Sequence, residues 1–210
     1  MTHQRIKRKP RCLGCGLPLR DCACDQLPRL KFRTPIAIVQ HVRERHKPTN
    51  TARLFARMAE GTTLLPCGMR EPAFDATPLE DPAIDWVLLY PRAGAPILDP
   101  GRTAAAGRRL GFVLLDGSWS QCSHMSRRLP VIAGLPAVAL PPGSPSFWTV
   151  RTQHLEQGRS TLEAAAFVLE LLEGAASVAP LRRAFAELTA RHLHLKGKLR
   201  SPEIPAAWGI

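Results

Sequence analysis

Short apolar runs that end at turn residues mark the first predicted elements of the chain. Residues 35–41 (PIAIVQH), 86–90 (WVLLY) and 110–116 (LGFVLLD) each fit one buried strand. Strands that are covered on both faces appear as near-continuous apolar runs rather than as alternating ones. Residues 136–140 (PAVAL) form a further, shorter candidate. The pattern therefore predicts three buried strands and a fourth short one.

Helical patterns lie between and after these runs. They cover residues 49–61, 119–129, 160–174 and 180–197. Ser160 and Glu163 have the spacing of a capping box, in which each side chain accepts a hydrogen bond from the other residue's backbone. Pro180 stands in the expected first turn of the last helix, where proline is tolerated. Gly61 and Gly174 supply helix ends.

Strands that alternate with helices predict an α/β fold, with a mostly parallel sheet and helices on both of its faces. In such sheets, ligands bind where loops leave the carboxyl ends of the strands. The segments YPRAG (90–94) and DGSWS (116–120) are therefore the expected site loops. We expect three parts along the chain: a basic arm with a cysteine module at 1–34, the α/β body at 35–197 and a tail at 198–210.

The composition fits a folded chain with one sizeable core. The sequence has 210 residues, of which 45% are hydrophobic and 22% charged, as in ordinary globular domains. No apolar run is long enough for a membrane span, and no apolar stretch follows the basic first residues as it would in a secretory signal. We therefore expect a cytoplasmic protein without a membrane partner.

Positive charge is in excess and unevenly spread. Lysine and arginine number 29 against 17 acidic residues, which gives a formal charge of +12. The basic residues are concentrated in the first 33 positions and in residues 182–200. This concentration of positive charge in two stretches favours a polyanionic partner, nucleic acid above all. A purely solubilising role is the alternative.

Four cysteines lie within thirteen residues, in the segment CLGCGLPLRDCAC at 12–24. Cys12, Cys15, Cys22 and Cys24 form the pattern C-x2-C-x6-C-x-C, which supplies four soft ligands for a tetrahedral zinc ion. In a reducing compartment, clustered cysteines hold metal more often than they form disulfides. Free or redox-active thiols are the alternative. Four protein ligands close the site, so we expect a structural zinc in a small knob held by its ion.

Two further segments carry candidate chemistry. Asp116 ends an apolar strand at the expected site edge, where its carboxylate can accept a proton, orient a donor or cap the next helix. Trp119 can stack on a base or an adenine ring, or belong to the core. Residues 41–54 (HVRERHKPTNTARL) form a charged strand-to-helix loop suited to phosphate, with an exposed polar loop as the alternative. No Walker or dinucleotide glycine pattern is present.

Five segments, in this order, resemble the DTW-domain family of tRNA-uridine aminocarboxypropyltransferases, which is related to the SPOUT class of RNA-modifying enzymes. They are CLGCGLPLRDCAC, QHVRERHKPTNTARL, LLYP, LLDGSWSQC and RTQHLEQGRSTLEAA. Together they span residues 12 to 175. The D-x-T-W motif of the family reads Asp-Gly-Ser-Trp here, at 116–119, and serine keeps the hydroxyl group.

The resemblance implies transfer of the 3-amino-3-carboxypropyl group from S-adenosylmethionine to N3 of a uridine in tRNA, with release of methylthioadenosine. Asp116 is then the candidate general base, the group that orients the uracil imide, or only a part of the cofactor loop. A SPOUT-like body with a knotted C-terminal part is also implied. A SPOUT-type RNA methyltransferase and a non-catalytic zinc-containing RNA-binding protein are the alternatives.

The expected cofactor residues follow from the loop positions and the matching segments. They are Tyr90, Pro91, Leu115, Gly117, Ser118, Trp119, Arg151, Ser160, Thr161 and Glu163. Arg151 is expected to pair with the substrate carboxylate or with a phosphate. Contact with tRNA is expected at the zinc knob and at Arg43, Lys47, Asn50 and Arg53.

Overall fold

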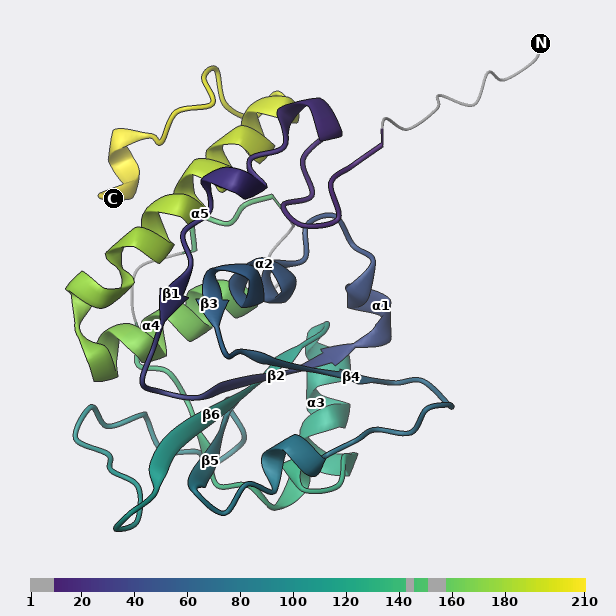
Figure 1. Cartoon of the computed structure of the whole chain (residues 1–210), viewed down its shortest axis with the longest axis vertical. Coiled ribbons are helices and arrows are strands. Elements are labelled where there is room, and N and C mark those ends of the chain that lie inside the picture. The colour runs from purple at the N-terminus through teal and green to yellow at the C-terminus, as the bar shows by residue number, and fades with distance from the viewer. Residues whose placement is uncertain (1–9, 143–145, 151–157) are drawn as a thin grey trace.

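A computed structural model describes residues 10–142, 146–150 and 158–210, and its centre is a five-stranded sheet in the order β4-β2-β6-β5-β7 (Figure 1). The strands are β2 Ile36–His41, β4 Thr63–Cys67, β5 Ile84–Leu89, β6 Arg109–Asp116 and β7 Ala137–Val138. Every neighbouring pair is parallel. The carboxyl ends of the strands therefore meet at one edge of the sheet.

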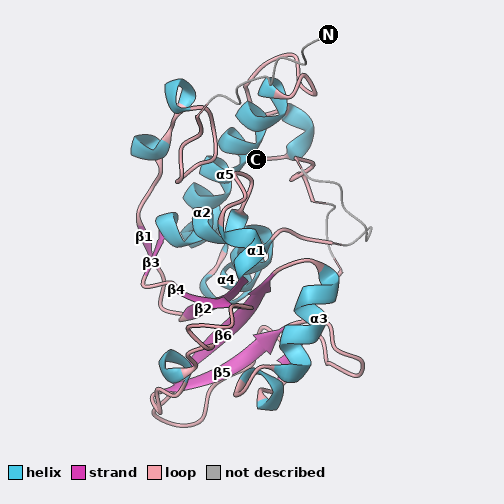
Figure 2. Ribbon diagram, turned by 90° about the vertical axis from the view of Figure 1, so that its right-hand side faces the viewer, coloured by secondary structure: helices cyan, strands magenta, loops and turns pink. Residues whose placement is uncertain are grey.

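Helices cover both faces of this sheet, which confirms the predicted layers (Figures 1 and 2). On one face lie α2 Thr51–Met58, α4 Thr161–Glu173 and α5 Ala175–Leu195, and on the other lies α3 Trp119–Arg128. A short helix, α1 Val42–Arg45, directly follows β2. Alternate strand residues supply two cores: Ile38 and Phe112 pack on the α4 side, whereas Val39 and Val113 pack on the α3 side.

Two helix boundaries differ from the prediction. The helix expected over 49–61 ends at Met58, because Ala59–Glu60 (β3) pairs with Leu30–Lys31 (β1) in a separate two-stranded sheet. The last helix begins at Ala175, so Pro180 lies inside it rather than at its start. Val178 is fully buried in the core, and this packing favours helix on the N-terminal side of the proline.

The cysteine module packs on the core of the body. Leu17 is fully buried, and Cys15 and Ala23 are nearly so, in the cluster that also contains the buried side chains of α4 and α5. The Nε2 atom of His192, on α5, lies 2.9 Å from the carbonyl oxygen of Cys15. Figure 1 shows the module, in purple, beside α5. The module is thus docked on the body, while the predicted domain boundaries stay predictions.

The C-terminal tail fixes the segment at 146–150. The rings of Trp208 and Phe147 stack with centroids 5.0 Å apart. Lys196 Nζ donates to the carbonyl of Val150 at 2.6 Å, and Lys198 Nζ donates to that of Thr149 at 3.3 Å. No helix in the described part of the chain is both long and apolar enough to cross a membrane.

Candidate functional site

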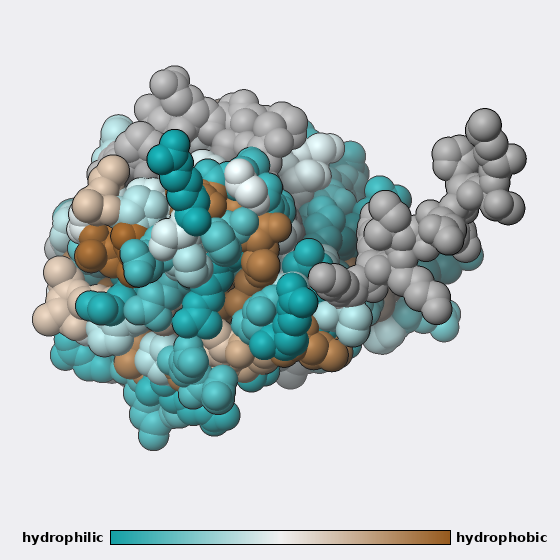
Figure 3. Space-filling model, turned by 90° about the horizontal axis from the view of Figure 1, so that it is seen from above, coloured by the Kyte–Doolittle hydropathy of each residue, from teal (hydrophilic) through white to brown (hydrophobic). Residues whose placement is uncertain are grey.

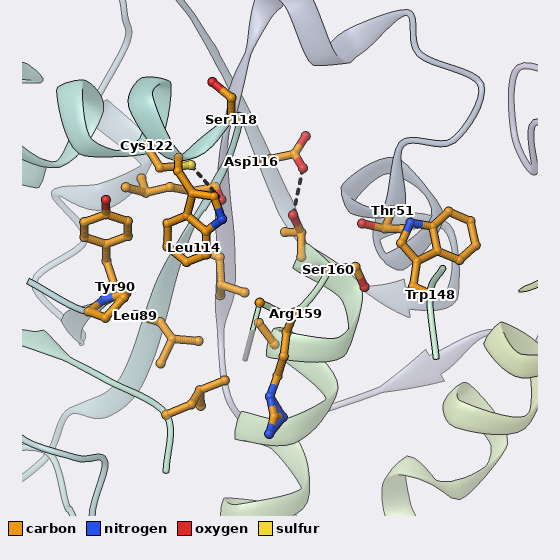
Figure 4. Close-up of a pocket in the computed structure, with 18 of the residues that line it drawn as sticks. Thr51, Leu89, Tyr90, Leu114, Asp116, Ser118, Cys122, Trp148, Arg159 and Ser160 are labelled. Atoms are coloured by element: carbon orange, nitrogen blue, oxygen red, sulfur yellow. Dashed lines mark hydrogen bonds between the residues drawn. The ribbon is translucent and has the colours of Figure 1, made fainter. Parts of the chain in front are cut away.

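A cavity of about 580 Å³ opens at the carboxyl ends of β5 and β6 (Figure 4). Its wall also includes residues from α1, the starts of α2, α3 and α4, and the segments at 139–142 and around Trp148. This is the edge at which parallel sheets place their ligands, and the volume is that of a small-molecule site. The predicted site loops therefore meet in one place.

Eight of the ten expected cofactor residues line this cavity. They are Tyr90, Pro91, Leu115, Gly117, Ser118, Trp119, Ser160 and Thr161. Glu163 is not among the described lining residues, because its carboxylate is directed to Ser146 and to the backbone of Ser160. Arg151 lies outside the described residues. The lining thus joins both predicted loops with the start of α4.

Asp116 has both carboxylate oxygens engaged in the wall of this cavity. It is 5% exposed. Its Oδ1 accepts from Thr161 Oγ1 at 2.7 Å (Figure 4), and its Oδ2 accepts from Asn50 Nδ2 at 2.6 Å and from Gln40 Nε2 at 3.0 Å. These bonds tie β2, the start of α2 and the start of α4 to the end of β6. Because an ionised oxygen has about two acceptor positions, Oδ1 can take one more donor.

Asn50 connects this carboxylate to α2. Its side chain is buried and caps the helix, with Oδ1 accepting from the backbone N–H of Arg53 at 2.8 Å. The same oxygen accepts from Gln40 Nε2 at 3.1 Å. The amide therefore points into the protein and is not accessible from its surface. This placement makes Asn50 a positioning residue for Asp116.

The other expected RNA contacts divide into two kinds. Arg43 and Lys47 are exposed on the segment between β2 and α2. Arg53 is half-buried, and its guanidinium donates to the carbonyls of Arg45 at 2.9 Å and Lys47 at 3.2 Å. Burial lowers the pKa of Arg53. Arg53 thus holds the backbone of this segment, whereas Arg43 and Lys47 are accessible to a partner.

An aromatic pair stands at one side of the cavity. The ring centroids of Tyr90 and Trp119 are 6.3 Å apart and the rings are tilted by 40°. Trp119 is 39% exposed, so part of its face is open to a ligand. Burial raises the pKa of Tyr90, which keeps the phenol protonated. In Figure 4, Tyr90 and Trp148 flank Asp116 from opposite sides. Such faces can stack on a base or an adenine ring.

Helices α3 and α4 both begin at the cavity wall with capping boxes. Ser118 caps α3, and its hydroxyl accepts from the backbone of Gln121. Ser160 caps α4 in the same way with Glu163, which confirms the predicted box. A hydroxyl that accepts a backbone N–H still carries its own proton. Ser118 and Ser160 can therefore each donate one hydrogen bond into the cavity.

Glu163 has its place behind this wall. Its Oε2 accepts from the backbone of Ser160 at 2.8 Å, and its two oxygens accept from Ser146 Oγ at 2.8 and 2.7 Å. Ser146 Oγ in turn accepts from the backbone N–H of Trp148 at 3.1 Å. Glu163 therefore positions the segment that carries Trp148 into the cavity.

We expect Glu163→Ala to lower the free energy of unfolding by about 1–3 kcal/mol, because it removes a helix cap and leaves Ser146 without its acceptor. Glu163→Gln keeps one acceptor oxygen and should lose less. Urea denaturation measures both changes. Glu187→Ala on α5 is the control. Glu187 forms an exposed ion pair with Arg183, and its loss should cost about 0.5 kcal/mol or less. Equal losses in Glu163→Ala and Glu187→Ala would contradict the positioning role.

Glu44, Trp148 and Arg159 are among the lining residues that were not predicted from the sequence. Trp148 is buried against Phe185, with ring centroids 5.1 Å apart. Arg159 is half-buried with its guanidinium 4.6 Å from the ring centroid of Phe167, and burial lowers its pKa. Its position directly before a capping serine in a matching segment was a usable signal. Glu44 had no such signal among its charged neighbours.

The four clustered cysteines converge on one point. Their sulfur atoms all lie within 4.8 Å of one another, and the Cys12–Cys24 and Cys15–Cys22 pairs are 3.5 and 3.9 Å apart. Four thiolates at about 2.3 Å from a zinc ion form a tetrahedron with edges of about 3.8 Å. The donor set and its spacing therefore fit, and the cluster can hold a metal ion.

One thiol of the cluster ionises readily. Burial alone would raise the pKa of Cys12, but hydrogen bonds from the backbone of Cys15 and Gly14 and from the neighbouring thiols outweigh it and lower the pKa to about 6. The Gly14 N–H lies 3.3 Å from this sulfur. The thiolate is the form that binds metal, so the local backbone favours metal binding.

The cysteine module also touches the segment that carries Asn50. Gly16 has a φ of +74°, and a Cβ atom at this position would lie 1.7 Å from the carbonyl oxygen of Pro48. Only glycine allows this backbone conformation and this close approach together. The module thus packs directly against the backbone of the 41–50 segment at Pro48.

Comparison with known proteins gives a consistent set of relatives. The model of the DTW domain matches residues 9–193. The chain is similar to tRNA-uridine aminocarboxypropyltransferase 2 of Macaca fascicularis (28% identical over 177 residues), Mus musculus (27% over 175) and Drosophila melanogaster (31% over 175). These alignments cover 80%, 81% and 79% of this chain but 58%, 59% and 68% of the relatives. No solved structure gives a significant match.

Proposed function

Because this chain belongs to the DTW-domain family, we propose that it transfers the 3-amino-3-carboxypropyl group of S-adenosylmethionine to N3 of a uridine in tRNA. The observation that carries the proposal is the buried carboxylate of Asp116 at the end of β6, in the wall of a small-molecule cavity. Four of the five segments that carry the resemblance contribute residues to the cavity wall. The relatives are named tRNA-uridine aminocarboxypropyltransferases.

The reaction exchanges one bond at carbon. The bond between the sulfonium sulfur and the γ-carbon of the methionine chain breaks, and a bond between uridine N3 and that carbon forms. The sulfur keeps the electron pair and leaves in neutral methylthioadenosine. N3 becomes nucleophilic only as it loses its proton. We assign this proton to Asp116, whose Oδ1 has room for one more hydrogen bond beside that of Thr161.

The enzyme has to choose among three carbons bonded to the same sulfur. Only orientation can make this choice, because all three are activated. Tyr90, Pro91 and Trp119 offer an aromatic and apolar wall suited to the adenine ring. Thr51, Ser160 and Thr161 line a polar part of the cavity. We place the methionine chain on this polar side, so that its γ-carbon points toward Asp116.

We propose zinc as the metal of the cysteine cluster. Four cysteine sulfurs are a soft and closed ligand set, typical of structural zinc. Bound there, zinc would supply a fixed link among the parts of the module. The residues that would hold it are Cys12, Cys15, Cys22 and Cys24.

The proposed partner is tRNA. The charge of +12 favours a polyanion, and exposed Arg43 and Lys47 lie on the segment that borders the cavity. The face seen from above in Figure 3 is mostly hydrophilic, with apolar groups scattered over it. The SPOUT relationship, the knotted C-terminal part, the expected role of Arg151 and the cytoplasmic location remain proposals that rest on the sequence and the resemblance.

The test is to incubate the protein with unmodified tRNA and S-adenosylmethionine and to analyse the nucleosides by mass spectrometry. We expect a uridine heavier by one aminocarboxypropyl group and an equal amount of methylthioadenosine. A methylated nucleoside with S-adenosylhomocysteine would assign the chemistry to the methyltransferase alternative. Bound but unchanged tRNA with intact S-adenosylmethionine would favour the non-catalytic RNA-binding protein.

A further inference from the structure

Glu44 is a buried carboxylate in the cavity wall to which the proposed reaction assigns no role. Its side chain is 4% exposed, and it lines the cavity from α1. Lys47 forms an ion pair with it, lines the same cavity and keeps 48% of its side chain exposed. The cavity thus contains a buried negative charge next to a half-exposed positive one.

A buried carboxylate costs free energy even when it is paired, and apolar residues can often replace such pairs without loss of stability. A buried ion pair in a cavity wall is therefore poorly explained by stability alone, and such charged groups are common at ligand sites. Burial and the negative charges of Asp116 and Glu44 raise the pKa of the Cys122 thiol to about 12. Cys122 belongs to α3 and lines the cavity, so the field of Glu44 extends to the α3 side of the cavity.

Hydrogen bonds connect this pair to the proposed reaction centre. The backbone N–H of Lys47 donates to the carbonyl of Glu44 at 3.1 Å, and that of Asn50 donates to the carbonyl of Lys47 at 3.0 Å. The Asn50 amide then donates to Asp116 at 2.6 Å. Arg53 adds its guanidinium to the Lys47 carbonyl at 3.2 Å. The backbone that carries the two charges is therefore linked to the residue that positions Asp116.

We propose that Glu44 and Lys47 bind the amino-acid end of S-adenosylmethionine, Glu44 through the α-ammonium group and Lys47 through the α-carboxylate. This inference rests on the proposed function. The two ligand charges are attached to one carbon, and the ion pair offers one partner to each. Both groups are attached to the α-carbon, and the γ-carbon is two bonds from it. Anchoring the α-carbon therefore also orients the γ-carbon toward the nucleophile. The methyl group on the sulfur is not held in this way. The pair therefore determines which carbon is transferred.

The test compares two ligands by calorimetric titration of the full chain. Glu44→Gln keeps the shape of the side chain and removes its charge. We expect it to weaken S-adenosylmethionine binding by about 10- to 100-fold. Methylthioadenosine lacks the amino-acid end, so its affinity should change by less than about twofold, which also shows that the cavity is intact. Glu60→Gln, at the exposed position of strand β3, is the matched control and should change neither affinity.

Lys47→Gln tests the other half of the inference independently. It should weaken S-adenosylmethionine by about 10-fold and leave decarboxylated S-adenosylmethionine, which has the ammonium but no carboxylate, close to the wild-type affinity. The glutamine amide can still donate to Glu44, which keeps a polar partner in place of the Lys47 charge. An unchanged affinity for methylthioadenosine shows that this variant is folded with its cavity intact.

An equal loss for S-adenosylmethionine and methylthioadenosine in Glu44→Gln would show that Glu44 only shapes the cavity, and would overturn the inference. Unchanged S-adenosylmethionine affinity in both variants would overturn it as well. If the wild-type protein binds S-adenosylmethionine and transfers its aminocarboxypropyl group, either result contradicts the inference alone. If the wild-type protein binds no S-adenosylmethionine, the proposed function fails, and the inference fails with it.

Discussion

Replacing Asp116 by asparagine is expected to lower aminocarboxypropyl transfer at least about 100-fold while the protein stays folded. The variant amide can keep an oxygen toward Asn50 and Gln40, the two amide donors on Oδ2. Its NH2 group then faces Thr161, whose hydroxyl can rotate and accept. This exchange costs about 1–2 kcal/mol of stability, but an NH2 group cannot accept the uridine proton. Single-turnover transfer, followed by mass spectrometry, measures the loss.

Two controls separate chemistry from binding in this experiment. Titration with S-adenosylmethionine should give an affinity for Asp116→Asn close to that of the wild type. Thr161→Ser keeps the hydroxyl that bonds Asp116 and should transfer at nearly the wild-type rate. If a folded Asp116→Asn protein no longer binds the cofactor, the assignment of Asp116 as base loses its support. Wild-type transfer by that variant would exclude the assignment.

Cys22→Ser should remove one equivalent of zinc and lower the melting temperature by about 10 °C or more. The module contributes Cys15 and Leu17 to the same core as α5, so loss of the ion exposes core surface. A structural zinc site contributes several kcal/mol to folding, and each kcal/mol shifts the midpoint by about 2–4 °C in a chain of this size. Metal analysis and scanning calorimetry measure the two effects, and a chelator should reproduce them on the wild type.

Cys67→Ala is the matched control for this variant. Cys67 is buried on the other side of the sheet, where its sulfur lies 3.0 Å from that of Met125. The control should lose some stability through its small cavity but keep the full zinc equivalent. A purified wild-type protein without zinc, or a Cys22→Ser protein that retains a full equivalent, would contradict the metal site.

The features that could be predicted depend on a few neighbouring residues. The capping box of Ser160 and Glu163 needs only four positions, and the structure contains both of its bonds. Strands β2, β5 and β6 are apolar along their length because helices cover both faces. Asp116 follows directly from the end of such a strand. These elements could be predicted because neighbouring residues in the sequence determine them.

Other elements depend on partners that are distant in sequence. Strand β4 was not predicted, because its run is short and contains Pro66; it lies at an edge of the sheet, where a missing N–H is tolerated. Helix α2 ends early because Ala59 pairs with Leu30. Pro180 does not start α5, since packing of Val178 extends the helix before it. Each difference is a tertiary effect that overrides a local signal.

The same limit applies to the candidate site. Six of the expected cofactor residues followed from the positions of two loops, and Ser160 and Thr161 followed from a segment that carries the resemblance; all eight line the cavity. Within residues 41–54, however, nothing local separates the inward side chains of Glu44 and Asn50 from the outward one of Arg43. Asn50 turns inward because Asp116, 66 residues later, accepts its amide hydrogen. That contact exists only in the folded chain.

The contact between Cys15 and His192 means that the cysteine module can pack only late during synthesis of the chain. The two residues are 177 positions apart, and a ribosome adds roughly 5–20 residues per second. The four thiols therefore leave the ribosome roughly 10–35 s before the helix on which they dock. During this interval Leu17 has no surface to cover it, and only an ion captured by the nascent chain would hold the module together. The cysteine module is thus translated well before the helix that covers it, and it can be packed only after that helix has formed.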